Sequence, residues 1–134
     1  MKSREQCLVY QTADVQAILK IQRSSAYSLI RQAYETGKPF HVIKIGTAYR
    51  IPRTGFNRWI NGEDGRGEPA VYDIKQLQDI LGVKRTAAYR LAEKAYLEQV
   101  PFRVLKVGSL YRIPQYSFDS WLNQEFLKKT WSLR

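Results

Sequence analysis

GTAYRIP (residues 46–52) and GSLYRIP (residues 108–114) decide the fold, because each joins a turn glycine to an alternating strand that a proline ends. In the first copy, apolar and polar residues alternate over residues 40–45 before the glycine and again over residues 48–51 after it. Gly46 and Thr47 supply the turn between the two runs. The sequence therefore predicts a β-hairpin in each copy.

The similarity between the two copies extends well beyond the hairpins. Residues 10–61 align with residues 72–123 without a gap, and 22 of the 52 aligned positions are identical. Between the copies lies GEDGRGEP (residues 62–69), whose glycines, acidic residues and proline are typical of a linker. We therefore predict a first module at residues 1–62, a linker at 63–69 and a second module at 70–134 that includes a C-terminal extension.

Helical periodicity surrounds each hairpin. In the first copy Thr12 can cap a helix over residues 13–19, and a second helix is expected from about Arg23 to Glu35 after a short turn. Beyond the hairpin, Phe56, Trp59 and Ile60 have the i, i+3, i+4 spacing of a closing helix. Trp59 and its counterpart in the second copy, Trp121, are expected in the core. The predicted fold class is α+β, mainly helical: two tandem winged helix-turn-helix modules, each with a helix-turn-helix, a β-hairpin wing and a closing helix.

Charge and composition limit the possible functions. The 134-residue chain carries a formal net charge of +10, distributed as +7 over residues 1–62, −2 over 63–69 and +5 over 70–134, which favours a nucleic-acid partner. One cysteine (Cys7) and one histidine (His41, expected at the surface) argue against an internal disulfide, a structural zinc site and most catalytic sets. No run is apolar enough for a membrane span or a signal peptide. We expect a cytoplasmic, non-enzymatic protein with no cofactor, no metal and no membrane partner.

The motifs resemble those of the excisionase-type helix-turn-helix domain, a relative of the MerR DNA-binding domain. The resemblance rests on two sets of matching residues. In the first copy they are Tyr10, Leu19, Arg23, Tyr27, Leu29, Pro39, Lys44, Gly46, Tyr49, Arg50, Ile51, Pro52 and Trp59. In the second they are Tyr72, Leu81, Gly82, Arg85, Tyr89, Leu91, Pro101, Lys106, Gly108, Tyr111, Arg112, Ile113, Pro114 and Trp121.

The resemblance implies a DNA-binding role for each second helix and each hairpin. The helix would enter the major groove and the wing would lie along the backbone or the minor groove. It also implies a role in a mobile element or plasmid: excision, transfer-origin recognition in conjugation, replication or transcription regulation. The expected partners are double-stranded DNA and a recombinase, relaxase or other protein of the same element.

Candidate DNA-binding residues lie opposite the apolar stripe of each second helix and in the wings. In the helices they are Arg23, Ser24, Tyr27, Ser28, Arg31, Arg85, Thr86, Tyr89, Arg90 and Lys94. In the wings they are Lys44, Thr47, Arg50, Lys106, Ser109 and Arg112. Strand alternation predicts that the wing lysines and arginines project outward. Tyr27 and Tyr89 can either donate to phosphate or pack against the fold, and each polar position can instead be an ordinary solvated surface.

The outward faces of the two copies differ although their inward faces agree. Arg90 replaces Ser28 and Glu93 replaces Arg31, which suggests two non-identical half-sites on one DNA. An eight-residue linker extends at most about 28 Å, so adjacent half-sites are within reach. The alternatives are a protein-binding adaptor and a weakly specific architectural DNA-binding protein, while a tyrosine relaxase or recombinase lacks the histidines it needs. Residues 124–134 either extend the last helix over the second module or form a partner surface.

Overall fold

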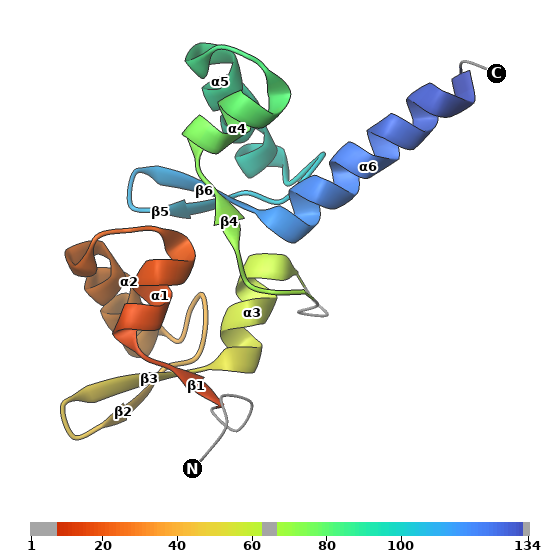
Figure 1. The fold of residues 1–134 in the computed structure, drawn as a ribbon. Helices are drawn as coiled ribbons and strands as arrows, with labels where there is room; N and C mark the ends of the chain where they lie inside the picture. Colours follow the sequence, from red (N-terminus) through yellow and green to blue (C-terminus); the bar gives the residue numbers. More distant parts are fainter. Residues whose placement is uncertain (1–7, 63–66, 133–134) are drawn as a thin grey trace. The chain divides into compact units, whose positions relative to one another are not determined.

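The computed structural model describes residues 8–62 and 67–132, with side chains described as far as residue 124. The chain divides into two compact units, residues 1–69 and 70–134. Figure 1 shows the helices and strands of each unit. Cys7 and the side chains of Leu127 and Trp131 in the predicted tail lie outside the described residues.

The first unit places two helices before a hairpin and one after it. Its elements are β1 (Val9–Tyr10), α1 (Thr12–Leu19), α2 (Arg23–Thr36), β2 (Ile43–Ile45), β3 (Ala48–Pro52) and α3 (Arg53–Asn61). The strands form an antiparallel sheet in the order β1-β3-β2, with Lys44 directly opposite Tyr49. Gly46 turns the hairpin with a φ of 62°, a conformation that suits glycine because it has no Cβ. The predicted hairpin and second helix are confirmed in this unit.

The second unit has the same order of elements. They are β4 (Val71–Tyr72), α4 (Ile74–Leu81), α5 (Arg85–Glu98), β5 (Leu105–Val107), β6 (Leu110–Pro114) and α6 (Gln115–Ser132). The sheet order is β4-β6-β5, and Lys106 lies opposite Tyr111 as Lys44 does opposite Tyr49. The helix α6 continues to Ser132, so the backbone of the C-terminal extension prolongs the closing helix.

Two features of these elements differ from the sequence-based expectation. A short first strand in each unit, β1 and β4, pairs with the long hairpin strand. Its two residues are too few for periodicity to reveal. The expectation that Thr12 caps the first helix is wrong, because α1 begins at Thr12 and Gln11 occupies the capping position. The backbone N–H of Gln11 donates to the Asp14 carboxylate at 2.9 Å, which ties the start of α1 to its first turn.

The core of each unit lies between the helices and the sheet. In the second unit it contains Ile74, Leu77, Ala88, Ala92, Ala95, Phe102, Val104, Tyr111, Ile113 and Phe118. Trp121 packs beside Phe102, with ring centroids 5.2 Å apart, and Trp59 packs beside Phe40 at the same separation. The prediction that both tryptophans belong to the cores is confirmed. The alanines on the inner face of α5 are buried in this core, and the residues of its opposite face are exposed.

A capping box fixes the start of α4. The carboxylate of Asp73 accepts from the Gln76 backbone N–H at 2.8 Å, and the Gln76 side chain accepts from the Asp73 N–H at 3.0 Å. We expect Asp73→Ala to lower the free energy of unfolding by about 0.5–2 kcal/mol, because a backbone donor loses its partner. Urea unfolding of the second unit measures this loss. Asp73→Asn should retain most of the stability, since Asn caps as well as Asp, and an equal loss in both variants would contradict the capping role.

The connector between the units is held at its C-terminal end. The side-chain amide of Asn61, the last residue of α3, donates to the carbonyls of Gly67 and Glu68 at 3.2 Å each. Just beyond the connector, the backbone N–H of Gln115 in the second unit donates to the carbonyl of Ala70 at 2.9 Å. Gly67 and Glu68 are therefore hydrogen-bonded to the end of α3, while the predicted bounds of the linker stay a prediction.

Candidate nucleic-acid interface

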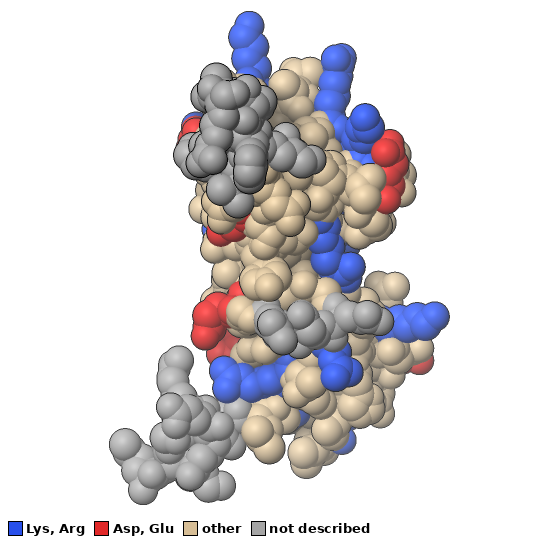
Figure 2. Space-filling view, turned by 90° about the vertical axis from the view of Figure 1, so that its right-hand side faces the viewer, with Lys and Arg blue, Asp and Glu red and all other residues tan. Residues whose placement is uncertain are grey.

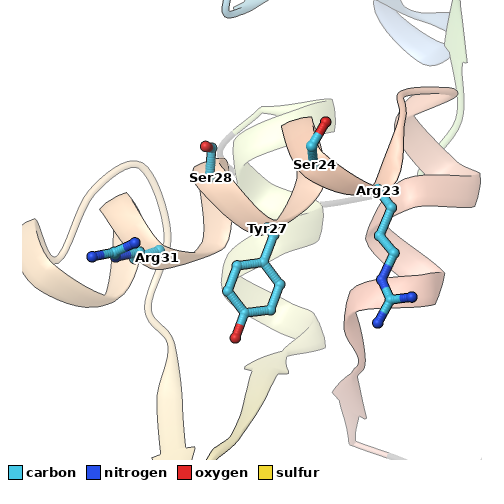
Figure 3. A pocket seen from close by; sticks show the side chains of 5 residues that line it. All are labelled: Arg23, Ser24, Tyr27, Ser28 and Arg31. Atoms are coloured by element: carbon cyan, nitrogen blue, oxygen red, sulfur yellow. The ribbon is translucent and has the colours of Figure 1, made fainter.

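The outer face of α2 carries the residues predicted for it. Arg23, Ser24, Tyr27, Ser28 and Arg31 line one shallow, open pocket on this helix. Figure 3 shows the serine hydroxyls along one edge of α2 and Arg23 and Tyr27 reaching past the other. All five residues are exposed, with Tyr27 45% exposed, so their polar atoms are accessible to a partner. The helix thus presents hydroxyl and guanidinium groups together on one surface.

The outer face of α5 repeats this arrangement with different chemistry. Arg85, Thr86, Tyr89 and Arg90 line the equivalent pocket, and all four are exposed. Lys94 is also exposed, one turn beyond Arg90, but it does not line the pocket. The structure therefore brings together four of the five residues predicted for α5 and places the fifth beside them.

A second pocket in the first unit lies where α1 meets α2. It is lined by Thr12, Ala13, Gln16, Arg23 and Tyr27, so Arg23 and Tyr27 belong to both pockets. The residue before α2 is Gln22, and its side chain does not cap the helix. The first N–H groups of α2 and the Arg23 guanidinium thus give this end of the helix positive potential. That combination suits a phosphate.

The two outer faces differ most at Arg31 and Glu93, which occupy equivalent positions. Arg31 Nε lies 3.7 Å from a carboxylate oxygen of Glu35, and both side chains are more than 60% exposed. In the second unit Glu93 stands in place of Arg31 and Leu97 in place of Glu35. An exposed ion pair stabilises a helix by only a few tenths of a kcal/mol, so Arg31 is easily released to a partner. The same surface point thus offers a donor in one unit and an acceptor in the other.

The wings expose their lysines as predicted, and their turn hydroxyls are exposed as well. Lys44 and Thr47 are exposed in the first unit, and Lys106 and Ser109 in the second. On β5 the neighbours of Lys106 are buried, which follows the predicted alternation. On β2 the neighbours of Lys44 are not buried, since Ile43 is 39% and Ile45 66% exposed.

The expectation that the wing arginines project outward is wrong for Arg112, which is only 8% exposed. Its Nη1 donates to the backbone carbonyl of Tyr111 at 2.9 Å, so the side chain folds back along its own strand. Burial lowers the pKa of the Arg112 guanidinium, and the nearby Asp73 carboxylate opposes that shift. Arg50 makes the same contact with the Tyr49 carbonyl at 2.8 Å and is half-buried. Both arginines thus bond to their own strand, and the wing lysines are the more exposed cations of the hairpins.

Four tyrosines that are absent from the predicted site lie between the helix and the wing: Tyr34 and Tyr49 in the first unit, and Tyr96 and Tyr111 in the second. Tyr49 in β3 contacts Tyr27 and Tyr34 of α2, and Tyr111 in β6 contacts the equivalent Tyr89 and Tyr96 of α5. The available signal is the repetition of all three tyrosines in both copies. Helical periodicity places Tyr34 on the apolar stripe of its helix, yet Tyr34 is 44% exposed.

Basic side chains project from the surface of the molecule. Figure 2 shows Lys and Arg standing out on the face in view, with Asp and Glu in smaller groups between them. No helix in the described part of the chain has the length and apolarity to cross a membrane. Among the described residues, no group of three or more His, Cys, Asp or Glu is arranged to hold a metal ion.

Comparison with known proteins identifies one domain. Residues 71–125 match the model of a family described as a helix-turn-helix domain. No curated protein and no solved structure gives a significant match to the chain. The match confirms the predicted helix-turn-helix for α4 and α5, with the hairpin and the start of α6 inside the matched range, while the same assignment for the first unit stays a prediction. Residues 71–125 of the second unit are therefore similar to a helix-turn-helix domain.

Proposed function

We propose that the chain is a non-enzymatic, sequence-specific double-stranded DNA-binding protein that uses both units to recognise two adjacent half-sites. The observation that carries this proposal is the recurrence of one site. The outer faces of α2 and α5 line equivalent open pockets with arginine, hydroxyl and tyrosine side chains. The net charge of +10 supports a polyanionic partner, since each neutralised phosphate releases counterions.

In each unit, some residues bind phosphates and others contact bases. Arg23 and Arg85 at the helix starts, and Lys44 and Lys106 in the wings, bind phosphates and fix the register of the protein on the duplex. Arg31 and Arg90 read guanine through paired hydrogen bonds, and Thr86 and the serines of α2 add contacts to bases or phosphates. Glu93 accepts a hydrogen bond from the cytosine amino group where Arg31 reads guanine. The two half-sites therefore differ in sequence.

We further propose that the protein is an accessory or regulatory factor of a mobile element or plasmid. This rests on the resemblance of both copies to the excisionase-type domain. The process is excision, transfer-origin recognition, replication control or transcription control, and a recombinase or relaxase of the same element is the expected protein partner. Selection of bound sites from random and genomic DNA, followed by footprinting on the selected sequence, tests the central claim. Enrichment of a composite site with two unlike halves supports it, and failure to enrich any sequence contradicts it.

The wing lysines give a prediction about salt. We expect Lys44→Gln with Lys106→Gln to weaken binding to all sequences by similar factors, because phosphate contacts carry no sequence information. The slope of log K against log salt should fall by about 0.9 for each phosphate that the variant no longer neutralises. Titrations of fluorescent DNA from 50 to 300 mM salt, roughly spanning the range where such slopes are linear, measure it.

The matched control for this experiment removes the same charge elsewhere. Lys38→Gln with Arg58→Gln also lowers the net charge by two, from exposed positions outside the helix faces and the wings. The control should leave the slope nearly unchanged. An equal decrease of slope in both double variants would mean that the wings act through net charge alone and make no contact of their own.

A further inference from the structure

Tyrosine rings hold the wing lysine of each unit against its second helix, α2 in the first unit and α5 in the second. In the second unit Lys106 Nζ lies 5.5 Å from the ring centroid of Tyr111 and 5.9 Å from that of Tyr96. In the first unit Lys44 Nζ lies 5.4 Å from Tyr49 and 5.7 Å from Tyr34. All four distances are within about 6 Å, the range in which an ammonium is attracted to the face of a ring. The lysine therefore has a preferred position although its strand is at the surface.

One buried tyrosine in each unit contacts both that lysine and two tyrosines of the helix. Tyr111 is 6% exposed, and its ring lies 5.3 Å from Tyr89 and 5.7 Å from Tyr96. Tyr89 and Tyr96 are seven residues apart, so two turns of α5 present them on one side. The interplanar angle of 71° between Tyr89 and Tyr111 gives an edge-to-face contact, a favoured arrangement for aromatic pairs.

The first unit repeats the same set of contacts. Tyr49 is 8% exposed, with its ring 5.7 Å from Tyr27 at 73° and 5.6 Å from Tyr34 at 57°. The sheet register adds to the restraint, because Lys44 is paired directly across the hairpin from Tyr49. The ring contacts agree between the two units in partners, distances and angles, so both copies of the repeat have the same arrangement.

We propose that Tyr49 and Tyr111 are positioning residues for DNA recognition. Each fixes a wing lysine and a helix tyrosine, Tyr27 or Tyr89, as parts of one surface, so that phosphate contacts from the wing and contacts from the helix are made in a fixed register. Tyr49 and Tyr111 do not touch DNA in this arrangement. The proposal rests on the DNA-binding function proposed above and adds the residue that couples its two contact elements.

The ring is essential to this role and the hydroxyl is not. Tyr111→Phe keeps the ring, whereas Tyr111→Leu keeps apolar bulk in the core and removes the ring face. We expect Tyr111→Phe to bind as the unmodified chain does. We expect Tyr111→Leu to lower the slope of log K against log salt by about 0.9, because Lys106 no longer occupies its phosphate-binding position. For each tenfold change of salt, the affinity would then change about eightfold less than that of the unmodified chain.

A double-mutant cycle shows whether Tyr111 acts through Lys106. Lys106→Gln alone should cause a similar decrease of slope, and adding Tyr111→Leu to it should cause little more. A second readout needs no DNA: the ε-methylene protons of Lys106 should show a ring-current shift in NMR spectra that Tyr111→Phe keeps and Tyr111→Leu removes. The NMR spectra also report whether each variant is folded, and Tyr49→Leu with Tyr49→Phe repeats the cycle on Lys44 if the Tyr111 variants unfold.

The outcomes separate this inference from the proposed function. Additive effects in the cycle, or a full salt slope in a folded Tyr111→Leu chain, would overturn the positioning role while DNA binding stands. If the unmodified chain binds a selected site no more tightly than random DNA, or shows no salt-dependent binding to DNA at all, the proposed function itself fails. A ring-current shift that survives in Tyr111→Leu would show that Tyr96 alone holds the lysine and would also overturn the role given to Tyr111.

Discussion

Reversing the charge of Arg85 and Arg90 together should lower the affinity of the intact chain for its selected DNA site by about 10²–10⁴-fold. Both arginines line the exposed pocket of α5, so their replacement by Glu places negative charge where phosphates and a base edge would lie. If both units bind one duplex, engagement of the second unit is intramolecular, and its loss removes that whole advantage. Fluorescence titration at fixed salt measures the change, because affinities at different salt concentrations are not comparable.

A matched variant distinguishes loss of one unit from loss of charge. Lys38→Glu with Arg58→Glu alters the net charge equally, from exposed residues outside α2, α5 and the wings. This variant should lower the affinity for the selected DNA site far less. Arg23→Glu with Arg31→Glu in the first unit should produce a drop comparable to that of the second-unit variant. If reversal in one unit leaves both affinity and footprint intact, that unit does not read DNA and the two-half-site proposal is wrong.

Arg90→Ala should weaken the free energy of binding to the selected DNA site by on the order of 1–3 kcal/mol, which is about 5- to 150-fold in affinity. The loss should be confined to one base pair, and the preference for that base pair should relax. Arg90 is exposed on α5 with its fork of donors accessible, and a guanidinium that reads guanine loses both hydrogen bonds when it is truncated. The measurement compares the variant on DNA sites that carry each of the four base pairs at every position of the second half-site. Ser28→Ala, at the equivalent position of α2, should change affinity much less. An equal decrease for specific and random DNA would instead make Arg90 a phosphate contact.

Much of the fold can be predicted because its signals are local. The hairpins follow from alternation around Gly46 and Gly108, and the long helices from apolar residues at helical spacing. Periodicity alone predicts a helix start at Arg23, and α2 does begin there with an uncapped N-terminus. The outward positions of α2 and α5 follow from the same periodicity. These residues are fixed by helix geometry, which is why the pockets of α2 and α5 contain them.

The parts that cannot be predicted depend on contacts between elements. Alternation predicts the face of a strand from which a side chain projects, but not the position of the end of a long side chain. It therefore does not predict the hydrogen bond from the Arg112 guanidinium to the Tyr111 carbonyl. The ring contacts of Tyr49 and Tyr111 join a helix to a strand, and no spacing within either element shows them. Asn61 aligns with Asn123 in the repeat, yet Asn61 is buried and Asn123 is exposed, so the repeat alone does not predict the burial of this position.

The hydrogen bonds of Asn61 bear on how the genome would be searched. Its amide holds the carbonyls of Gly67 and Glu68, Gln115 holds that of Ala70, and Pro69 lies between these anchored residues. If both units bind one duplex, these hydrogen bonds reduce the number of connector residues that can adapt to a change in half-site separation. Each added base pair moves a half-site by about 3.4 Å and rotates it about the duplex. Under the two-half-site proposal, the protein would recognise the separation of the two half-sites as well as their base sequences. Isolated half-sites elsewhere in the genome would then bind it more weakly. Asn61 would then contribute to the choice of target at a distance from every base pair it helps to select.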